Sequence, residues 1–165
     1  LPHLRGVRNN KRVAEKCGDH EMAFRISSQR TDLRIDDIHA MLSQVYWSLG
    51  ITAAEILKGI QHSALVVGAY DDQGRQIGFL RVVSDRVRFA YLADVVVHDD
   101  CRRQGIGQQM VNHALAHPDM SDVYQWFLMT VDAHGVYEQC GFKPLEHPDR
   151  WMSRVSPRPD RPDFD

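Results

Sequence analysis

The stretch AYLADVVVHDDCRRQGIGQQ, residues 90–109, decides the fold and carries the clearest chemical signal of the chain. An apolar strand ends at Val97, a polar turn follows, and a helix with an apolar stripe begins after it. Gly105 and Gly107 lie where the turn enters the helix, so a ligand can approach the backbone there. Because the first turn of a helix has unpaired N–H groups and partial positive charge, this stretch predicts an anion cradle suited to a pyrophosphate. Arg102 and Arg103 add positive charge to it.

A second motif follows the next apolar strand, which is predicted at residues 125–131. It reads Asp132-Ala133-His134-Gly135-Val136-Tyr137-Glu138-Gln139-Cys140-Gly141-Phe142. The order and separation of the two motifs resemble those of the GNAT superfamily of N-acetyltransferases, whose second motif is usually Leu-Tyr-x-x-x-Gly-Phe. The resemblance implies an α/β (α+β) fold, with a mixed, mostly antiparallel twisted sheet flanked by helices. It also implies transfer of an acetyl group from acetyl-coenzyme A (acetyl-CoA) to a primary amine of a small molecule or peptide, by direct attack in a ternary complex.

The resemblance also implies which residues hold the coenzyme. Its diphosphate is expected at the cradle, and its pantetheine arm is expected along the preceding strand, bonded to it like an added strand. The N–H of Val95 is then expected to face the thioester oxygen, and Tyr137 to lie beside the sulfur. The predicted coenzyme-binding residues are Val95, Val96, Val97, Arg102, Arg103, Gln104, Gly105, Ile106, Gly107, Gln108, Thr130, Asp132, His134 and Tyr137.

Two positions depart from the family pattern. Thr130 stands where the family often has an asparagine, and Arg103 stands where the commoner pattern has a glycine. A hydroxyl can take over part of the role of the asparagine, so coenzyme binding is expected to persist while its affinity is in question.

Tyr137 and Asp94 are the predicted catalytic residues. A phenol can give a proton to a departing thiolate, and the alternative for Tyr137 is a packed ring whose hydroxyl bonds a carbonyl. Asp94 is the candidate base because a carboxylate in an apolar strand costs free energy unless it has a partner or a function. The alternative is an ion pair with Arg81. Many family members remove the proton through water, so a dedicated base is not required. The predicted acceptor-binding residues are Tyr46, Trp47, Phe79, Arg81 and Tyr91.

Periodicity predicts the remaining elements. A helix is expected from Asp36 to just before Gly50, where apolar residues recur at helical spacing. Thr52 and Glu55 form a capping box that starts a second, shorter helix ending near Gln61. A third short helix is expected at residues 133–140, capped by Gly141. Strands are predicted at residues 23–28, 63–70, 76–84 and, more weakly, 151–155; residues 63–84 form a hairpin in which Ile77, Phe79 and Arg81 share a face.

Length and composition indicate a single globular domain. The chain has 165 residues, of which 43% are hydrophobic and 25% charged, and its net charge is −2. We expect a flexible extension at residues 1–21, a domain at 22–155 and a disordered tail at 156–165. Neither nucleic acid nor a membrane is an expected partner, and a homodimer stays open. With three cysteines and no secretory signal, the expected location is cytoplasmic.

Other functional classes compete with the transferase. A non-catalytic acyl-CoA sensor would use the same cradle without chemistry. A dinucleotide-binding oxidoreductase is disfavoured because the full Gly-x-Gly-x-x-Gly pattern is missing. A metal site is not predicted, since His113 and His117 share a helix face without a third ligand.

Overall fold

The computed structural model describes residues 23–157, so the expected extension at residues 1–21 and most of the expected tail lie outside the described residues. One five-stranded sheet runs through the molecule in the order β1-β2-β3-β4-β5. The first four strands are antiparallel neighbours, and β5 is parallel to β4. This confirms the predicted mixed, mostly antiparallel sheet. The strands are β1 Phe24–Ser27, β2 Leu65–Asp71, β3 Gln76–Ser84, β4 Phe89–Val97 and β5 Gln125–Phe127.

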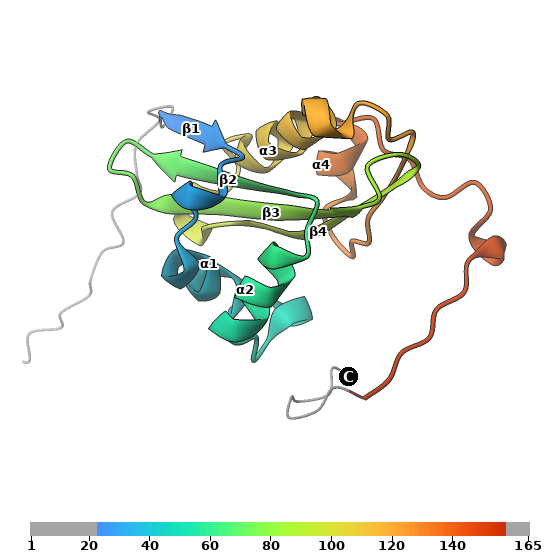
Figure 1. Cartoon of the computed structure of the whole chain (residues 1–165), viewed down its shortest axis with the longest axis horizontal. Helices are drawn as coiled ribbons and strands as arrows, with labels where there is room; N and C mark the ends of the chain where they lie inside the picture. The colour runs from blue at the N-terminus through green and yellow to red at the C-terminus, as the bar shows by residue number, and fades with distance from the viewer. Residues whose placement is uncertain (1–22, 158–165) are drawn as a thin grey trace, which may run out of the picture.

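Helices cover both faces of the sheet (Figure 1). On one face lie α1, Ile35–Leu42, and α2, Ala53–Gln61; on the other lie α3, Ile106–Leu115, and α4, His134–Glu138. Alternate strand residues point to opposite faces, so Phe79 of β3 joins the cluster under α1 and α2, while Leu80 joins the cluster under α3. Ile77 is an exception to the predicted face. It is the extra residue of a bulge, because Tyr70 pairs with Gln76 and Ala69 with Gly78, and its side chain packs on the α3 side.

The first predicted helix is wrong in its length. Helix α1 ends at Leu42, and a separate short 3-10 helix, Tyr46–Ser48, follows a turn. The Ser48 hydroxyl donates a hydrogen bond to the Leu42 carbonyl at 2.5 Å, which satisfies a carbonyl at the helix end. Val45 is buried as the apolar stripe predicts, but Tyr46 and Leu49 are 48% and 40% exposed because the chain has already turned.

Two predicted strand segments are absent or shortened. Strand β5 is limited to Gln125–Phe127 rather than reaching residue 131, and residues 151–155 form no strand. Strand geometry needs a hydrogen-bonded neighbour, and neither segment has one among residues 23–157. The local elements were predicted correctly: Thr52 and Glu55 form the full capping box, and the β2–β3 hairpin turns through Gly74 at φ +75°.

No helix within residues 23–157 has both the length and the apolar character that a membrane crossing requires.

Candidate active site

The two parallel strands β4 and β5 separate shortly after they meet. Their register joins only Phe89–Tyr91 of β4 to Gln125–Phe127 of β5, while β4 continues to Val97. From Leu92 onward, that edge of β4 pairs with no strand of the described chain. A strand edge with open backbone groups can bind an extended ligand as if it were another strand. The splay therefore provides a slot along the residues predicted to hold the pantetheine arm.

A β-bulge interrupts β4 inside this slot. Phe79 pairs with Val96 and Arg81 with Ala93, so Asp94 and Val95 together lie opposite one residue of β3. Asp94 has φ +53°, a left-handed conformation that a non-glycine residue rarely adopts. Bulges re-aim side chains and interrupt strand pairing, and residues held in such conformations cluster at functional sites. The bulge is thus located at the two residues predicted to serve as base and oxyanion donor.

Asp94 is already paired in this structure. Its carboxylate accepts a hydrogen bond from the Arg81 Nε at 2.5 Å, and both side chains are partly buried. The ion pair that the sequence left open as an alternative is therefore formed. The pair bridges β3 and β4 directly at the bulge.

The start of α3 presents a run of unbonded backbone amides. None of the N–H groups of residues 103–108 donates to an acceptor within residues 23–157. Arg103 at φ +62° and Gly105 at φ +75° alternate in the left-handed region, a backbone pattern that forms an anion-binding concavity. Free amides, this concavity and the helix dipole together fit a diphosphate.

The entrance of this cradle is open because Gly107 has no side chain. A Cβ placed on Gly107 would lie 3.7 Å from Val97 Cγ2, in the corner between the end of β4 and the start of α3. Ile106 is buried beneath α3, so it can contribute only its backbone to a ligand. Val96 is also buried, on the α1–α2 side of the sheet, and the same limit applies to it.

Charged side chains lie at the rim of the cradle. Arg102 pairs with Asp99 at 2.7 Å, and both groups are exposed. Exposed ion pairs contribute at most about 1 kcal/mol, so a bound anion can compete for this guanidinium. Arg103 and Gln104 are exposed and Gln108 is partly buried.

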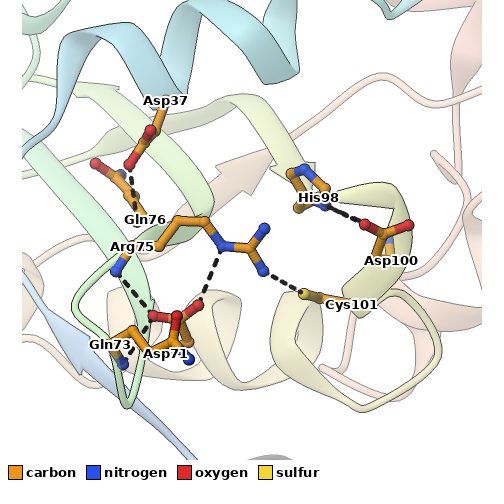
Figure 2. Close-up of polar contacts among 8 residues, drawn as sticks. All are labelled: Asp37, Asp71, Gln73, Arg75, Gln76, His98, Asp100 and Cys101. Atoms are coloured by element: carbon orange, nitrogen blue, oxygen red, sulfur yellow. Dashed lines mark hydrogen bonds and ion pairs between the residues drawn. The ribbon is translucent and has the colours of Figure 1, made fainter. Parts of the chain in front are cut away.

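A polar network that the sequence did not predict joins the β2–β3 turn to residues next to the cradle (Figure 2). The Arg75 guanidinium bonds the Asp71 carboxylate at 3.1 Å, and its Nη2 lies 3.9 Å from the sulfur of buried Cys101. Burial by itself raises the pKa of Asp71, but hydrogen bonds from the Arg75 amide and guanidinium outweigh it and the pKa is lowered. The β2–β3 turn is thereby tied to the residues just before Arg102. Arg75 and Cys101 are 26 residues apart in the chain, and no local sequence pattern predicts their contact.

Tyr137 is held by the way α4 ends. The Phe142 N–H bonds the Tyr137 carbonyl at 3.0 Å, the Gly141 N–H bonds the Glu138 carbonyl at 3.0 Å, and Gly141 has φ +89°. These bonds form a Schellman motif, and the accompanying apolar contact is the edge-to-face pair of Tyr137 and Phe142, with centroids 6.1 Å apart. The spacing Tyr-x-x-x-Gly-Phe is thus a helix stop that fixes the tyrosine.

The Tyr137 ring is buried, and its hydroxyl has no hydrogen-bond partner among residues 23–157. Burial raises its pKa to about 12, with smaller contributions from Cys140, Asp132 and Tyr91. The Tyr137 hydroxyl therefore does not bond a carbonyl of the described chain, as the alternative reading of this residue required. Tyr137 lines a cleft of about 370 Å³ together with Thr130 and His134.

Thr130 and Asp132 differ in their local roles. The Thr130 hydroxyl accepts a hydrogen bond from the Ala133 N–H at 3.1 Å, so it caps the turn into α4. Asp132 is exposed, and no side chain caps the helix at Ala133.

Another, smaller cavity of about 200 Å³ lies between α2 and the bulge of β4. It brings together three of the predicted acceptor-side residues, Trp47, Phe79 and Arg81, with Asp94. Phe79 is fully buried and forms part of its floor. Glu55 also lines the cavity and was missed as a site residue, although its capping box located it at the first turn of α2.

Two predicted acceptor-side residues lie outside this cavity. Tyr46 packs edge-to-face on Trp47, with centroids 5.0 Å apart, and remains half exposed. Tyr91 is on β4 in the short paired section opposite Phe127 of β5.

Comparisons with known proteins agree with this geometry. Residues 62–144 match the family model of the acetyltransferase (GNAT) domain. A structure from Xanthomonas campestris pv. campestris, provisionally assigned as an acetyltransferase of the GNAT family, is 38% identical with a TM-score of 0.75, over 82% of this chain and 94% of that one. Among curated proteins no significant match is found.

More distant structures share the fold. A GNAT-family acetyltransferase from Streptococcus pneumoniae is 22% identical with a TM-score of 0.64, covering 84% of this chain and all 100% of that one. Glucosamine-6-phosphate N-acetyltransferase from Arabidopsis thaliana is 18% identical with a TM-score of 0.58, covering 84% and 99%. The splayed strands, the amide cradle and these matches agree, and the chain belongs to the GNAT family of acetyltransferases.

Proposed function

We propose that the protein transfers the acetyl group of acetyl-CoA to a primary amine of a small molecule or peptide, by direct attack in a ternary complex. The observation that carries the proposal is the run of unbonded amides at residues 103–108, directly next to the open edge of β4. A diphosphate and an extended amide-bearing arm are joined in the coenzyme, and the chain offers adjoining sites for both.

The backbone would supply most of the coenzyme contacts. The amides of Arg103, Gln104, Gly105 and Gly107 would hold the diphosphate, and Arg102 would add charge at the rim. The open edge from Val95 to Val97 would hold the pantetheine arm. When bound, acetyl-CoA supplies an activated acetyl thioester.

Three groups of the chain would assist the transfer. The Val95 N–H, in the bulge, would donate to the thioester oxygen as negative charge develops on it. The Tyr137 hydroxyl would donate a proton to the sulfur; since burial raises its pKa to about 12, it is protonated at neutral pH. Its lack of an internal hydrogen-bond partner leaves that proton available.

Asp94 would receive the proton of the acceptor amine, directly or through water. It lines the 200 Å³ cavity that we propose as the acceptor site, beside Arg81 and Trp47. The Arg81 guanidinium would fix the direction of the carboxylate through its hydrogen bond. Trp47 lines the same cavity, where an aromatic ring would attract a cationic amine.

One observation favours the alternative, a non-catalytic acyl-CoA sensor: the Asp94 carboxylate is already bound by Arg81. Thiol release from acetyl-CoA, followed over a panel of amines, separates the two. An enzyme turns over at least one amine, and Tyr137→Phe then lowers kcat by roughly 10²- to 10⁴-fold. Calorimetry should give the same acetyl-CoA affinity for both proteins, and binding of NAD in its place would contradict the proposal.

A further inference from the structure

The Arg81 guanidinium uses only part of its hydrogen-bonding capacity. Its Nε donates to the Asp94 carboxylate at 2.5 Å, whereas neither Nη1 nor Nη2 donates to an acceptor among residues 23–157. These two nitrogens carry most of the N–H donors of the group. Because the Arg81 side chain is only 25% exposed, little water is available to take the place of the missing acceptors.

The two unbound nitrogens are accessible from the proposed acceptor cavity, which Arg81 lines. Within residues 23–157, the only fully buried side-chain nitrogens and oxygens without a partner belong to Tyr70 and His113, so Nη1 and Nη2 of Arg81 are not sealed in the core. Gly59 of α2 lines the same cavity, and a Cβ there would lie 3.6 Å from Nε and 3.9 Å from Nη1. Since Gly59 has no side chain, α2 does not cover the guanidinium at this position.

The carboxylates of the cavity already have partners. Asp94 is bound by Arg81, and the Glu55 Oε2 accepts hydrogen bonds from the Thr52 N–H and hydroxyl, each at 2.9 Å. The Ser48 hydroxyl donates to the Leu42 carbonyl. The remaining lining side chains are Trp47, Ile51, Ile56 and Phe79. The unused donors of this largely apolar cavity are therefore those of a cation, and they suit an anionic group of a ligand.

We propose that the acceptor is a small amino acid, whose carboxylate binds Nη1 and Nη2 of Arg81 while its amine lies beside Asp94. The inference rests on the proposed acetyl transfer and names the class of acceptor. The planar edge of a guanidinium matches the two oxygens of a carboxylate. Because Arg81 and Asp94 are in direct contact, the amine and the carboxylate of the acceptor must also be close together, as in an α- or β-amino acid.

The cavity also limits the rest of the acceptor. Its volume of about 200 Å³ is below the range of about 300–1,000 Å³ that is usual for drug-sized ligands. Ile56 and Phe79 are buried and favour an apolar side chain on the acceptor. At a peptide N-terminus the neighbouring carboxyl group is part of an amide bond, so a peptide offers no carboxylate at the required distance.

The transfer would then convert an amino acid into its N-acetyl derivative. The amino nitrogen forms a bond to the acetyl carbon as the bond between that carbon and sulfur breaks. The proton of the amine passes to Asp94, and the Tyr137 hydroxyl gives its proton to the departing thiolate. Arg81 takes no proton and holds the carboxylate of the acceptor.

Thiol release from acetyl-CoA tests the acceptor class with matched amines. The panel is alanine, valine, leucine and phenylalanine, each compared with its own amide, which keeps the amine and the shape but removes the negative charge. At least one amino acid should have a kcat/KM roughly 10- to 150-fold above that of its amide, as expected for one charge-assisted hydrogen bond. The difference should lie mainly in KM, because the carboxylate contributes to binding.

Two variants assign this preference to Arg81. Arg81→Lys keeps a positive charge beside Asp94 but has no planar fork, so its preference for the acid over the amide should fall to about three-fold or less. The matched control is Arg25→Lys, at an arginine that also pairs with an aspartate, Asp32, but lies on the edge strand β1. Its preference should equal that of wild type, and circular dichroism should show both variants folded.

Calorimetry separates this inference from the acetyl transfer. With coenzyme A bound in place of acetyl-CoA no transfer can occur, and an amino acid of the panel should still bind at least about ten-fold more tightly than its amide. Such binding without any turnover retains the acceptor class and contradicts the transfer. Turnover of the amides as fast as the acids retains the transfer and overturns the acceptor class.

Three other results would also overturn the inference. One is a panel that neither binds nor reacts, and another is a preference for phosphoethanolamine over every amino acid of the panel. The third is an Arg81→Lys variant that loses turnover of acid and amide alike while their ratio stays at the wild-type value, which is what a merely structural role predicts. The comparison of acid with amide on wild type needs no variant, so it is independent of the stability of Arg81→Lys.

Discussion

Replacing Gly107 by alanine should stabilise the protein and weaken coenzyme binding at the same time. Gly107 is in the first turn of α3, and its φ is not in the left-handed region. The added Cβ would contact Val97 Cγ2 at 3.7 Å, an ordinary van der Waals distance, so the fold accommodates it. The methyl group nevertheless occupies the corner through which a diphosphate would reach the amides of α3.

The two effects can be estimated separately. Replacing a helical glycine by alanine gains about 0.5–1 kcal/mol in unfolding free energy, which for a domain of this size raises Tm by roughly 1–4 °C. The loss of one charge-assisted hydrogen bond between an amide and a phosphate oxygen costs about 1.5–3 kcal/mol. The dissociation constant for acetyl-CoA should therefore rise by roughly 10- to 150-fold.

Calorimetry and thermal unfolding measure both quantities on the same samples. The matched control is Gly59→Ala in α2, whose Cβ would meet Arg81 Nε at 3.6 Å and which lies away from the cradle. It should gain similar stability with unchanged coenzyme affinity. Unchanged affinity in Gly107→Ala would refute the assignment of the diphosphate to this corner. A lowered Tm would show that the methyl group distorts the fold instead.

Three further outcomes are expected. Because burial raises the pKa of Tyr137 to about 12, the pH–rate profile of wild type should show no loss of activity near pH 10. A loss near pH 10 that disappears in Tyr137→Phe would contradict this expectation. Thr52→Ala removes the capping box with Glu55 and should lower unfolding free energy by about 1 kcal/mol without changing coenzyme affinity, as urea denaturation and calorimetry can check. Burial lowers the pKa of His113 below its ordinary 6.5, so the unfolded chain binds its proton more tightly and stability falls as the pH drops below about 6.5. His113→Leu should lose less Tm than wild type between about pH 8 and about pH 5, and an equal loss would contradict the assignment.

The sequence by itself determined the features that are local. The capping box at Thr52 joins residues three apart, and the stop of α4 joins Tyr137 to Phe142 five residues later. The cradle likewise depends on two glycines at the start of one helix. Such features follow from short-range backbone chemistry, which is legible without knowing what packs against it.

Only the tertiary structure decided the features that depend on partners distant in the chain. Residues 43–49 do not continue a helix, and residues 151–155 do not form a strand. Both outcomes depend on which partners these residues can bond and bury, so the sequence pattern alone predicted too long a helix and one strand too many. The pairing of Arg81 with Asp94 arises from strand register and from a bulge that no pattern in either strand announces. The same holds for Arg75 and Cys101, because contacts across a sheet are set by how the elements assemble rather than by spacing along the chain.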